Sequence, residues 1–333
     1  MKRIILDTDI GTDVDDAMAL SLAALSPELL IEGVTTVHAD APLRGRIAEH
    51  ILELAGRPDI RVVAGASIPL QMPLPPNFHW MPKLRGHEGQ GILNPNELMP
   101  TADLSATKDD AARFIIEKAR AYPGELSLVT IGALTNVGRA LQLEPLVADM
   151  IQDITIMGGA VDLTRMDWHP MLETNLNCDP LATRQVFDSG IPVTLVPIEV
   201  TTQVFLTDEQ RATMRAWGNR LADVLVTLME HMLEGMASLS EELNLPADIY
   251  RGRTFMHDPL AVYTSIATRF IVTRRMHVAI EFLDDVVRTI AYPKRTPNVR
   301  VCVNVDAPAL VDFWLGRIQE YATRSGVDVA ETR

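Results

Sequence analysis

The stretch IILDTDIGTDVDDAMALSLAAL, residues 4–25, decides the fold of this chain because its hydrophobic pattern changes from that of a strand to that of a helix. The apolar run over 3–7 predicts a buried β-strand, and the run from 15 to 25 predicts a helix. An acidic loop connects the two. A strand followed by a loop and a helix is the unit from which parallel α/β sheets are built.

The same alternation continues along the chain. Strand patterns over 32–37 and 126–131 precede helix patterns over 44–56 and 136–143. Further strands are predicted over 60–64, 153–157, 193–197, 277–281 and 299–303, and one helix over 208–245. Because buried parallel strands are continuous apolar runs, we expect an α/β fold with an open, twisted, mostly parallel sheet flanked by helices. The chain shows no internal repeat or Gly/Ser linker, so one domain over 1–333 is predicted.

Composition excludes several classes of partner. The 333 residues contain 30 Lys and Arg against 44 Asp and Glu, a net charge of −14, which opposes binding to nucleic acid. The two cysteines, Cys178 and Cys302, are too few for a disulfide framework and favour a reducing compartment. No run of 18 apolar residues predicts a membrane span, and the first apolar run is too short for a signal peptide. We therefore expect a cytoplasmic protein with no membrane partner.

Five aspartates gather in the first loop, at positions 7, 9, 13, 15 and 16. Two unit charges about 4 Å apart repel by roughly 4 kcal/mol at an effective dielectric near 20, so convergent carboxylates need a cation or raised pKa values. In open α/β sheets ligands bind at the carboxyl ends of strands, where this loop lies. The cluster predicts a divalent-cation site. The alternative is that Asp13 caps the helix and the others are solvated.

Two known kinds of metal-binding loop are alternatives for this acidic loop. An EF-hand loop that begins at Asp7 is excluded, because Gly11, Thr12 and Met18 stand where that loop needs Asp or Asn, Gly and Glu. A phosphatase of the haloacid dehalogenase type stays open as an alternative. In it Asp7 is the nucleophile and Asp9 the acid/base, with magnesium between them.

Later motifs favour a different family. After the acidic loop the chain carries TTV at 35–37, VAG at 63–65, GALTN at 132–136, MGG at 157–159, ETN at 173–175 with DP at 179–180, and HDP at 257–259. In this order and spacing the chain resembles the inosine-uridine preferring nucleoside hydrolases. The resemblance implies a Rossmann-like core and hydrolysis of the N-glycosidic bond of ribonucleosides to free base and ribose. It also implies a role in nucleoside catabolism and salvage, in a homodimer or homotetramer.

The resemblance also implies roles for individual residues. Calcium is expected on Asp9, Asp16, Asp258 and the main-chain carbonyl of Ile131, with Asp7 as their support. An all-oxygen ligand set suits Ca²⁺ better than Mg²⁺. Asp9 would orient and deprotonate a calcium-bound water, and His257 would protonate or polarise the leaving base. Ribose hydroxyls would be held by Asp15, Glu173 and Asn175.

Three departures from the family pattern limit these expectations. His38-Ala39-Asp40 stands where the family has x-Gly-Asn, so Asp40 is expected to replace a ribose-facing amide. This departure keeps open a non-catalytic protein that binds calcium or ribose. His87, in a loop similar to the family's base-covering flap, is a candidate base contact. Two extra residues in the acidic loop leave Asp13 without a role, and the base preference is open.

Overall fold

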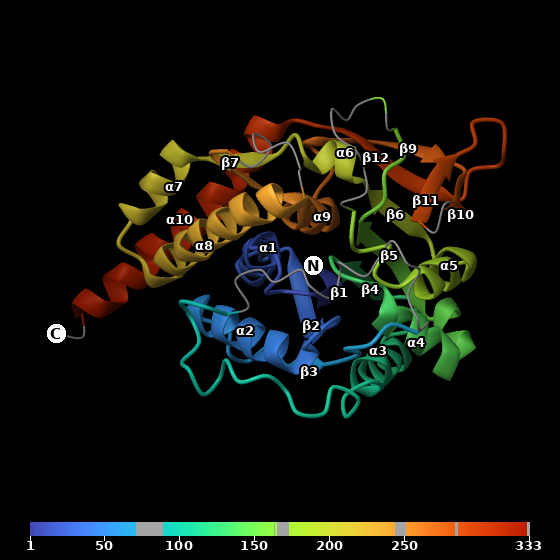
Figure 1. Ribbon diagram of the computed structural model, residues 1–333, viewed down its shortest axis with the longest axis horizontal. Helices are drawn as coiled ribbons and strands as arrows, with labels where there is room; N and C mark the ends of the chain where they lie inside the picture. The colour runs from blue at the N-terminus through green and yellow to red at the C-terminus, as the bar shows by residue number, and fades with distance from the viewer. Residues whose placement is uncertain (71–88, 163, 165–172, 244–250, 284–285, 332–333) are drawn as a thin grey trace.

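An eight-stranded sheet forms the centre of the protein in its computed structural model (Figure 1), which describes residues 1–333 apart from 71–88, 163, 165–172, 244–250, 284–285 and 332–333. The strand order is β3-β2-β1-β4-β5-β6-β12-β9. The bounds are β1 Lys2–Thr8, β2 Leu29–Thr36, β3 Val62–Ala64, β4 Leu126–Thr130, β5 Ile151–Met157, β6 Val193–Val196, β9 Ile271–Met276 and β12 Val299–Val305. Neighbouring strands are parallel except β12 and β9. The predicted α/β fold class is confirmed.

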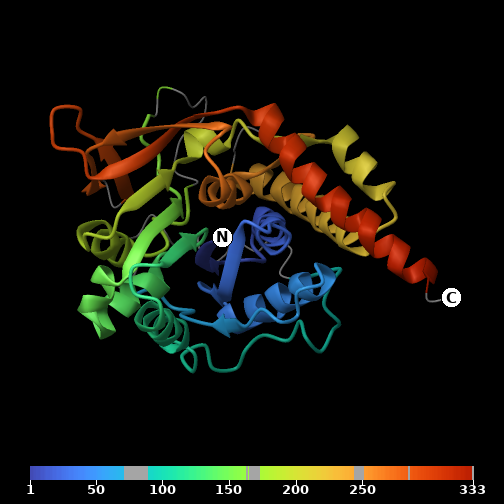
Figure 2. The ribbon, with the colours of Figure 1, turned by 180° about the vertical axis from the view of Figure 1, so that it is seen from behind.

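Helices cover both faces of the sheet. They are α1 Asp15–Ala24, α2 Ala41–Leu54, α3 Asp110–Ala121, α4 Thr135–Leu143, η3 Pro145–Asp149, α5 Pro180–Asp188, α6 Ile198–Thr201, α7 Asp208–Arg215, α8 Arg220–Leu243, α9 His257–Ile266 and α10 Ala307–Glu331. Ile4 and Leu6 of β1 belong to the core cluster that includes residues of α1, α2, α8, α9 and α10, whereas Ile5 belongs to the cluster that includes residues of α3, α4 and α5. Successive side chains of a strand point to opposite faces, so β1 is buried on both. Helix α10 packs against α1 and α8, and Figure 2 shows α10, in red, lying alongside α8.

The structure corrects the predicted helix over 208–245. It is two helices, α7 and α8, separated at residues 216–219, where Gly218 has a φ of 63°. Glycine adopts a positive φ at little cost, which lets the chain turn between the two helices at this position. Met229 and Met232 of α8 are buried in the core.

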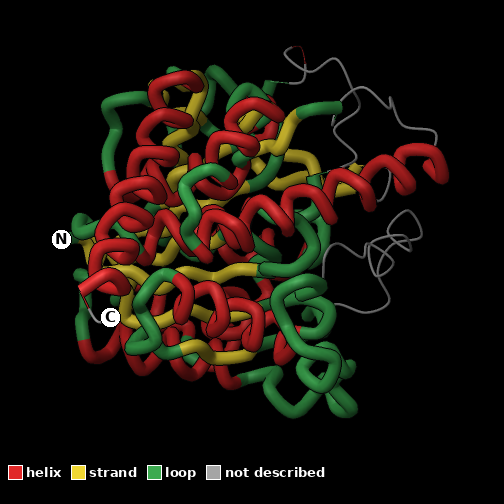
Figure 3. The backbone as a smooth tube through the Cα atoms, turned by 90° about the vertical axis from the view of Figure 1, so that its left-hand side faces the viewer, coloured by secondary structure: helices red, strands yellow, loops and turns green. Residues whose placement is uncertain are grey.

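The predicted strand over 277–281 exists but does not join the central sheet. It is β10, Val278–Leu283, which pairs antiparallel with β11, Val286–Ala291. A second small ladder joins β7, Phe205–Thr207, to β8, Arg253–Phe255. The tube view in Figure 3 shows strands enclosed by helices and loops. Over the described residues, no helix has the length and apolar character needed to cross a bilayer.

Candidate active site

Three buried carboxylates converge where α1 and α9 begin. Asp15 and Asp16 lie in the first turn of α1 and Asp258 in the first turn of α9. Their ligand oxygens all lie within 4.8 Å of one another. The backbone N–H of Asp258 donates to Asp15 Oδ2 at 3.2 Å, so the contact joins residues 243 positions apart. The fold therefore brings together two of the predicted metal ligands and one predicted ribose contact.

The electrostatics of this cluster favour a bound cation. Burial, followed by repulsion from neighbouring aspartates, raises the pKa of Asp15, Asp16 and Asp258 well above the ordinary value, and Asp9 adds to the repulsion at each. Carboxylates at such short range stay ionised together only when positive charge offsets them. Their oxygens are the ligands that a hard divalent cation takes in proteins. The donor set therefore fits the metal site predicted from the sequence.

The loop that carries Asp9 is fastened by Arg44, a buried residue of α2. Its Nη1 donates to the carbonyl oxygens of Asp9 and Ile10, the latter at 2.9 Å, and its Nη2 donates to Thr12 Oγ1 at 2.7 Å. Its Nε donates to the carbonyl of His38 at 2.8 Å. Arg44 therefore ties the loop after β1 to the loop after β2. Sequence analysis missed this role, because an arginine in a helix is usually solvated.

Gly132 leaves room for Asp9 and provides a test of its placement. A Cβ at position 132 would lie 2.8 Å from both the backbone N and Oδ1 of Asp9. We expect Gly132→Ala to displace Asp9 and lower kcat/KM roughly 100-fold, since shifts of about 1 Å in a catalytic group have effects of that size. Gly316→Ala, in open space on α10, is the matched control and is expected to keep wild-type activity. Unchanged kcat/KM in Gly132→Ala would contradict the importance of this packing.

Asp7 supports the site from beneath the loop. Its Oδ1 accepts hydrogen bonds from Thr35 Oγ1 at 2.5 Å and from Asn136 Nδ2 at 2.7 Å. Burial raises its pKa to about 7, against the lowering effect of these donors. Both donors come from other elements of the fold, so the Asp7 carboxylate joins β1 to β2 and to α4 and is already engaged there. This placement disfavours the alternative in which Asp7 attacks phosphorus.

The loop after β5 brings three further predicted residues together. Asn175 Nδ2 donates to the carbonyl oxygens of Ile131 at 3.0 Å and of Met157 at 3.2 Å. The Glu173 carboxylate accepts from Leu176 N at 3.1 Å. Burial raises the pKa of Glu173 to about 7. Asn175 therefore contacts the carbonyl predicted to bind the metal, and Glu173 lies two residues away on the same loop.

His257 precedes Asp258 at the start of α9. Its Nδ1 lies 2.6 Å from Thr201 Oγ1, and its ring stacks on Phe255 with centroids 5.3 Å apart. Burial lowers the pKa of His257 to about 4, so the imidazole is neutral near pH 7. A neutral imidazole can still donate one hydrogen bond to a substrate.

Asp40, Asp13 and His87 are the three residues at which the sequence departs from the family pattern. Asp40 is the N-cap of α2, accepting from Leu43 N at 2.9 Å, from Thr101 N at 2.7 Å and from Thr101 Oγ1 at 2.6 Å. These contacts give Asp40 a structural role, and its contact with ribose stays a prediction. Asp13 does not cap α1, because the N-cap residue is Val14 and no side chain makes a capping hydrogen bond there. Asp13 Oδ1 instead accepts from the backbone N–H of Val14 at 2.6 Å. His87 lies outside the described residues.

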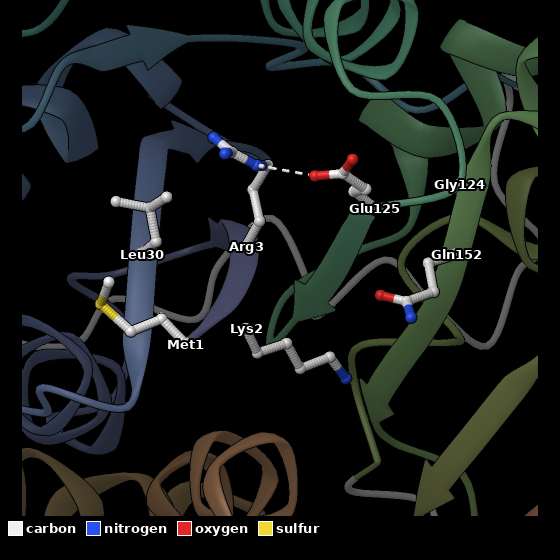
Figure 4. A pocket seen from close by; sticks show the side chains of 7 residues that line it. All are labelled: Met1, Lys2, Arg3, Leu30, Gly124, Glu125 and Gln152. Carbon is white, nitrogen blue, oxygen red and sulfur yellow. Dashed lines mark ion pairs between the residues drawn. The ribbon is translucent and has the colours of Figure 1, made fainter.

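A surface hollow of about 430 Å³ lies at the other end of β1 (Figure 4). Its charged side chains are paired: Lys2 with Asp153 at 2.8 Å, and Arg3 with Glu125 at 3.9 Å. Lys2 and Arg3 begin the strand, whereas Asp7 is near its end. The hollow is therefore separate from the acidic cluster.

Comparisons with known proteins agree with this geometry. A family model described as inosine-uridine preferring nucleoside hydrolase matches residues 4–312. The chain is 30% identical to the probable uridine nucleosidase 2 of Arabidopsis thaliana, over 96% of this chain and 98% of that protein. It is 29% identical to a pyrimidine-specific ribonucleoside hydrolase of Salmonella gallinarum, over 96% and 99% of the two chains.

Solved structures show the same likeness in three dimensions. A purine-preferring ribonucleoside hydrolase from Gardnerella vaginalis superposes with a TM-score of 0.76 at 27% identity, covering 96% of this chain and 99% of that one. The likeness therefore extends over the whole sheet and its helices.

Proposed function

Since the chain belongs to the inosine-uridine preferring nucleoside hydrolase family, we propose that it hydrolyses ribonucleosides to free base and ribose at the site formed by Asp9, Asp15, Asp16 and Asp258. It is a glycosidase of nucleoside catabolism. The observation that carries the proposal for the site is the buried cluster of Asp15, Asp16 and Asp258, which a cation would neutralise.

We propose Ca²⁺ as the cation, held by Asp9, Asp16, Asp258 and the carbonyl oxygen of Ile131. The oxygen-only donors and their burial support this choice, because Ca²⁺ accepts six to eight oxygens in flexible geometry. Asn175 holds the Ile131 carbonyl at 3.0 Å and so fixes its direction. When bound, the cation supplies positive charge and makes a nearby water a stronger nucleophile.

Different residues of the chain then carry out the separate parts of the reaction. Asp9 accepts a proton from the attacking water while the oxygen of that water bonds to the anomeric carbon of ribose. The bond from that carbon to the base breaks, and its electron pair leaves with the base. Asp15, Glu173 and Asn175 hold the ribose hydroxyls, and the nearby carboxylates stabilise the positive charge that develops on the sugar. His257 donates a hydrogen bond or a proton to the departing base.

A panel of ribonucleosides tests the function directly. Uridine, cytidine, inosine and guanosine are incubated with the protein and Ca²⁺, and free ribose is measured by a reducing-sugar assay with and without chelator. We expect ribose release that chelation abolishes. No release from any ribonucleoside would contradict the proposed function, and calcium or ribose binding without release would favour the non-catalytic alternative. The panel includes both base classes because the named relatives differ in base preference.

Removing the imidazole of His257 tests its role toward the leaving base. We expect His257→Ala to lower kcat for natural nucleosides by about 10²-fold or more, the usual contribution of an oriented donor to charge that develops in the transition state. Nitrophenyl riboside, whose leaving group needs little protonation, should be nearly unaffected. His50→Ala, a histidine of α2 that pairs with Glu53, is the control. Equal losses on both substrates would remove His257 from this role.

Other features of the proposal concern the protein as a whole. We propose that residues 1–333 act as one catalytic domain, in a cytoplasmic homodimer or homotetramer. Cys178 and Cys302 are both buried and form no disulfide, which supports a reducing compartment. Leu146, 63% exposed beside a hollow that includes Leu141 and Leu181, supports self-association, which light scattering after size-exclusion chromatography would measure. We also propose that His87 contacts the base.

A further inference from the structure

Thr201 is a fully buried residue at the end of α6, and its hydroxyl contacts the ring of His257. The two atoms, Thr201 Oγ1 and His257 Nδ1, are 2.6 Å apart. Helices α6 and α9 are neighbours in the fold, so the contact joins two packed elements. At 2.6 Å this is a short, strong hydrogen bond, and its direction determines which nitrogen of His257 carries a proton.

The surroundings of Thr201 decide that direction. Within the part of the chain that the structure describes, its hydroxyl proton has one other acceptor in reach, the carbonyl oxygen of Ile198 at 3.2 Å. That oxygen already accepts from Thr202 N at 3.0 Å and from Thr202 Oγ1 at 2.9 Å. A carbonyl oxygen has two lone pairs, and the closer donors occupy both. The Thr201 hydroxyl therefore donates to His257 Nδ1.

The consequence for His257 follows from imidazole chemistry. In neutral imidazole one nitrogen is a donor and the other an acceptor. With Nδ1 accepting from Thr201, the proton is on Nε2, on the other side of the ring. Stacking on Phe255, at 5.3 Å and an interplanar angle of 30°, limits rotation that would exchange the two nitrogens.

We propose that Thr201 is a positioning residue that sets the tautomer of His257, so that Nε2–H is presented to the leaving base. The inference rests on the proposed function, because it requires that His257 acts on the base. The base gains electron density as the glycosidic bond breaks, and a donor that is already oriented stabilises it without rearrangement. The wrong tautomer would present a lone pair instead.

Replacing the hydroxyl by a methyl group tests this role. Thr201→Val keeps the shape of a fully buried side chain and leaves Nδ1 without its donor. We expect kcat for uridine or inosine to fall about 10- to 100-fold, the range usual for loss of a partner that orients a histidine, with KM changed by at most about twofold. Turnover of nitrophenyl riboside should stay near the wild-type rate. Thr201→Ser, which restores the hydroxyl, should recover the natural substrates.

Thr264→Val is the matched control. Thr264 lies on the same helix as His257, and its Oγ1 donates to the Leu260 carbonyl at 2.8 Å. The substitution removes a comparable hydroxyl but does not touch the histidine. We expect wild-type kinetics on both substrates. A loss in this variant equal to that in Thr201→Val would show a general packing effect and overturn the inference.

Nitrogen NMR of the protein labelled with ¹⁵N-histidine gives a readout independent of activity. The His257 signals, assigned by their loss in His257→Gln, should show a protonated Nε2 and an unprotonated Nδ1, and Thr201→Val should change that pattern. An Nδ1–H tautomer in the wild type, or equal kinetic losses on natural and activated substrates, would overturn the role of Thr201. An inactive wild type with the expected Nε2–H signal would contradict the proposed function but not the tautomer assignment.

Discussion

Asp9→Ala is expected to lower kcat for nucleoside hydrolysis by about 10⁴-fold or more, because one substitution removes both the proposed proton acceptor and a proposed metal ligand. The fold should survive. Asp9 adds to the repulsion that raises the pKa of Asp15, Asp16 and Asp258, so its removal relieves charge in the metal-free protein. The measurement is kcat on the preferred ribonucleoside, together with a thermal unfolding curve.

Two companion variants make this result specific. Asp9→Asn keeps the size of the side chain and one oxygen ligand but cannot accept the proton, so it should lose nearly as much activity. Asp59→Ala removes a side chain that pairs with Arg57 at the surface and should keep the wild-type rate. Activity in Asp9→Ala within tenfold of wild type would refute the assignment of Asp9 as the base.

Removal of the cation is expected to abolish hydrolysis and to lower the melting temperature. A ligand present at 100 times its Kd stabilises the folded state by about 2.7 kcal/mol, which for a chain of this size raises Tm by about 4 °C. Calcium should therefore restore both activity and Tm to protein treated with chelator, and magnesium should do so less well. Unchanged Tm and activity after thorough chelation would contradict a metal at this site.

Asp258→Asn locates that effect in the acidic cluster. The variant loses a proposed ligand and one of three mutually repelling carboxylates, so its metal-free Tm should equal or exceed that of the wild type while the rise with calcium is lost. Asp59→Asn makes the same change of charge at the surface and should keep the full rise. A normal calcium response in Asp258→Asn would place the ion elsewhere.

The central strands were predictable because burial on both faces leaves a largely apolar run, as in Ile4 to Leu6 of β1. Strand β9 was not predicted. It is at the edge of the sheet, where Arg274 and Arg275 are exposed, so its pattern lacks that signal. The hairpin of β10 and β11 has strand character too, but nothing in a local pattern says which sheet a strand joins.

Only the site residues that lie in recognisable sequence motifs could be predicted. Asp258 is 243 positions from Asp15, and resemblance alone connected the two. Arg44 and Thr201 were missed because their importance comes from the acceptors around them, the loop carbonyls and His257 Nδ1. Asp40 did carry a local signal: an aspartate ahead of Ala41-Pro42 is typical of a helix N-cap, which is the role it has.

The four hydrogen-bonding contacts of Arg44 have a consequence for how the enzyme meets its substrate. They fix the Asp9 loop to the start of α2 before any ligand arrives, so the floor of the site is rigid. Its ordering entropy is lost once, when the chain folds, and not again in each encounter with a nucleoside. We therefore expect ribose to meet a preformed surface at this floor, with any induced fit confined to other walls of the site.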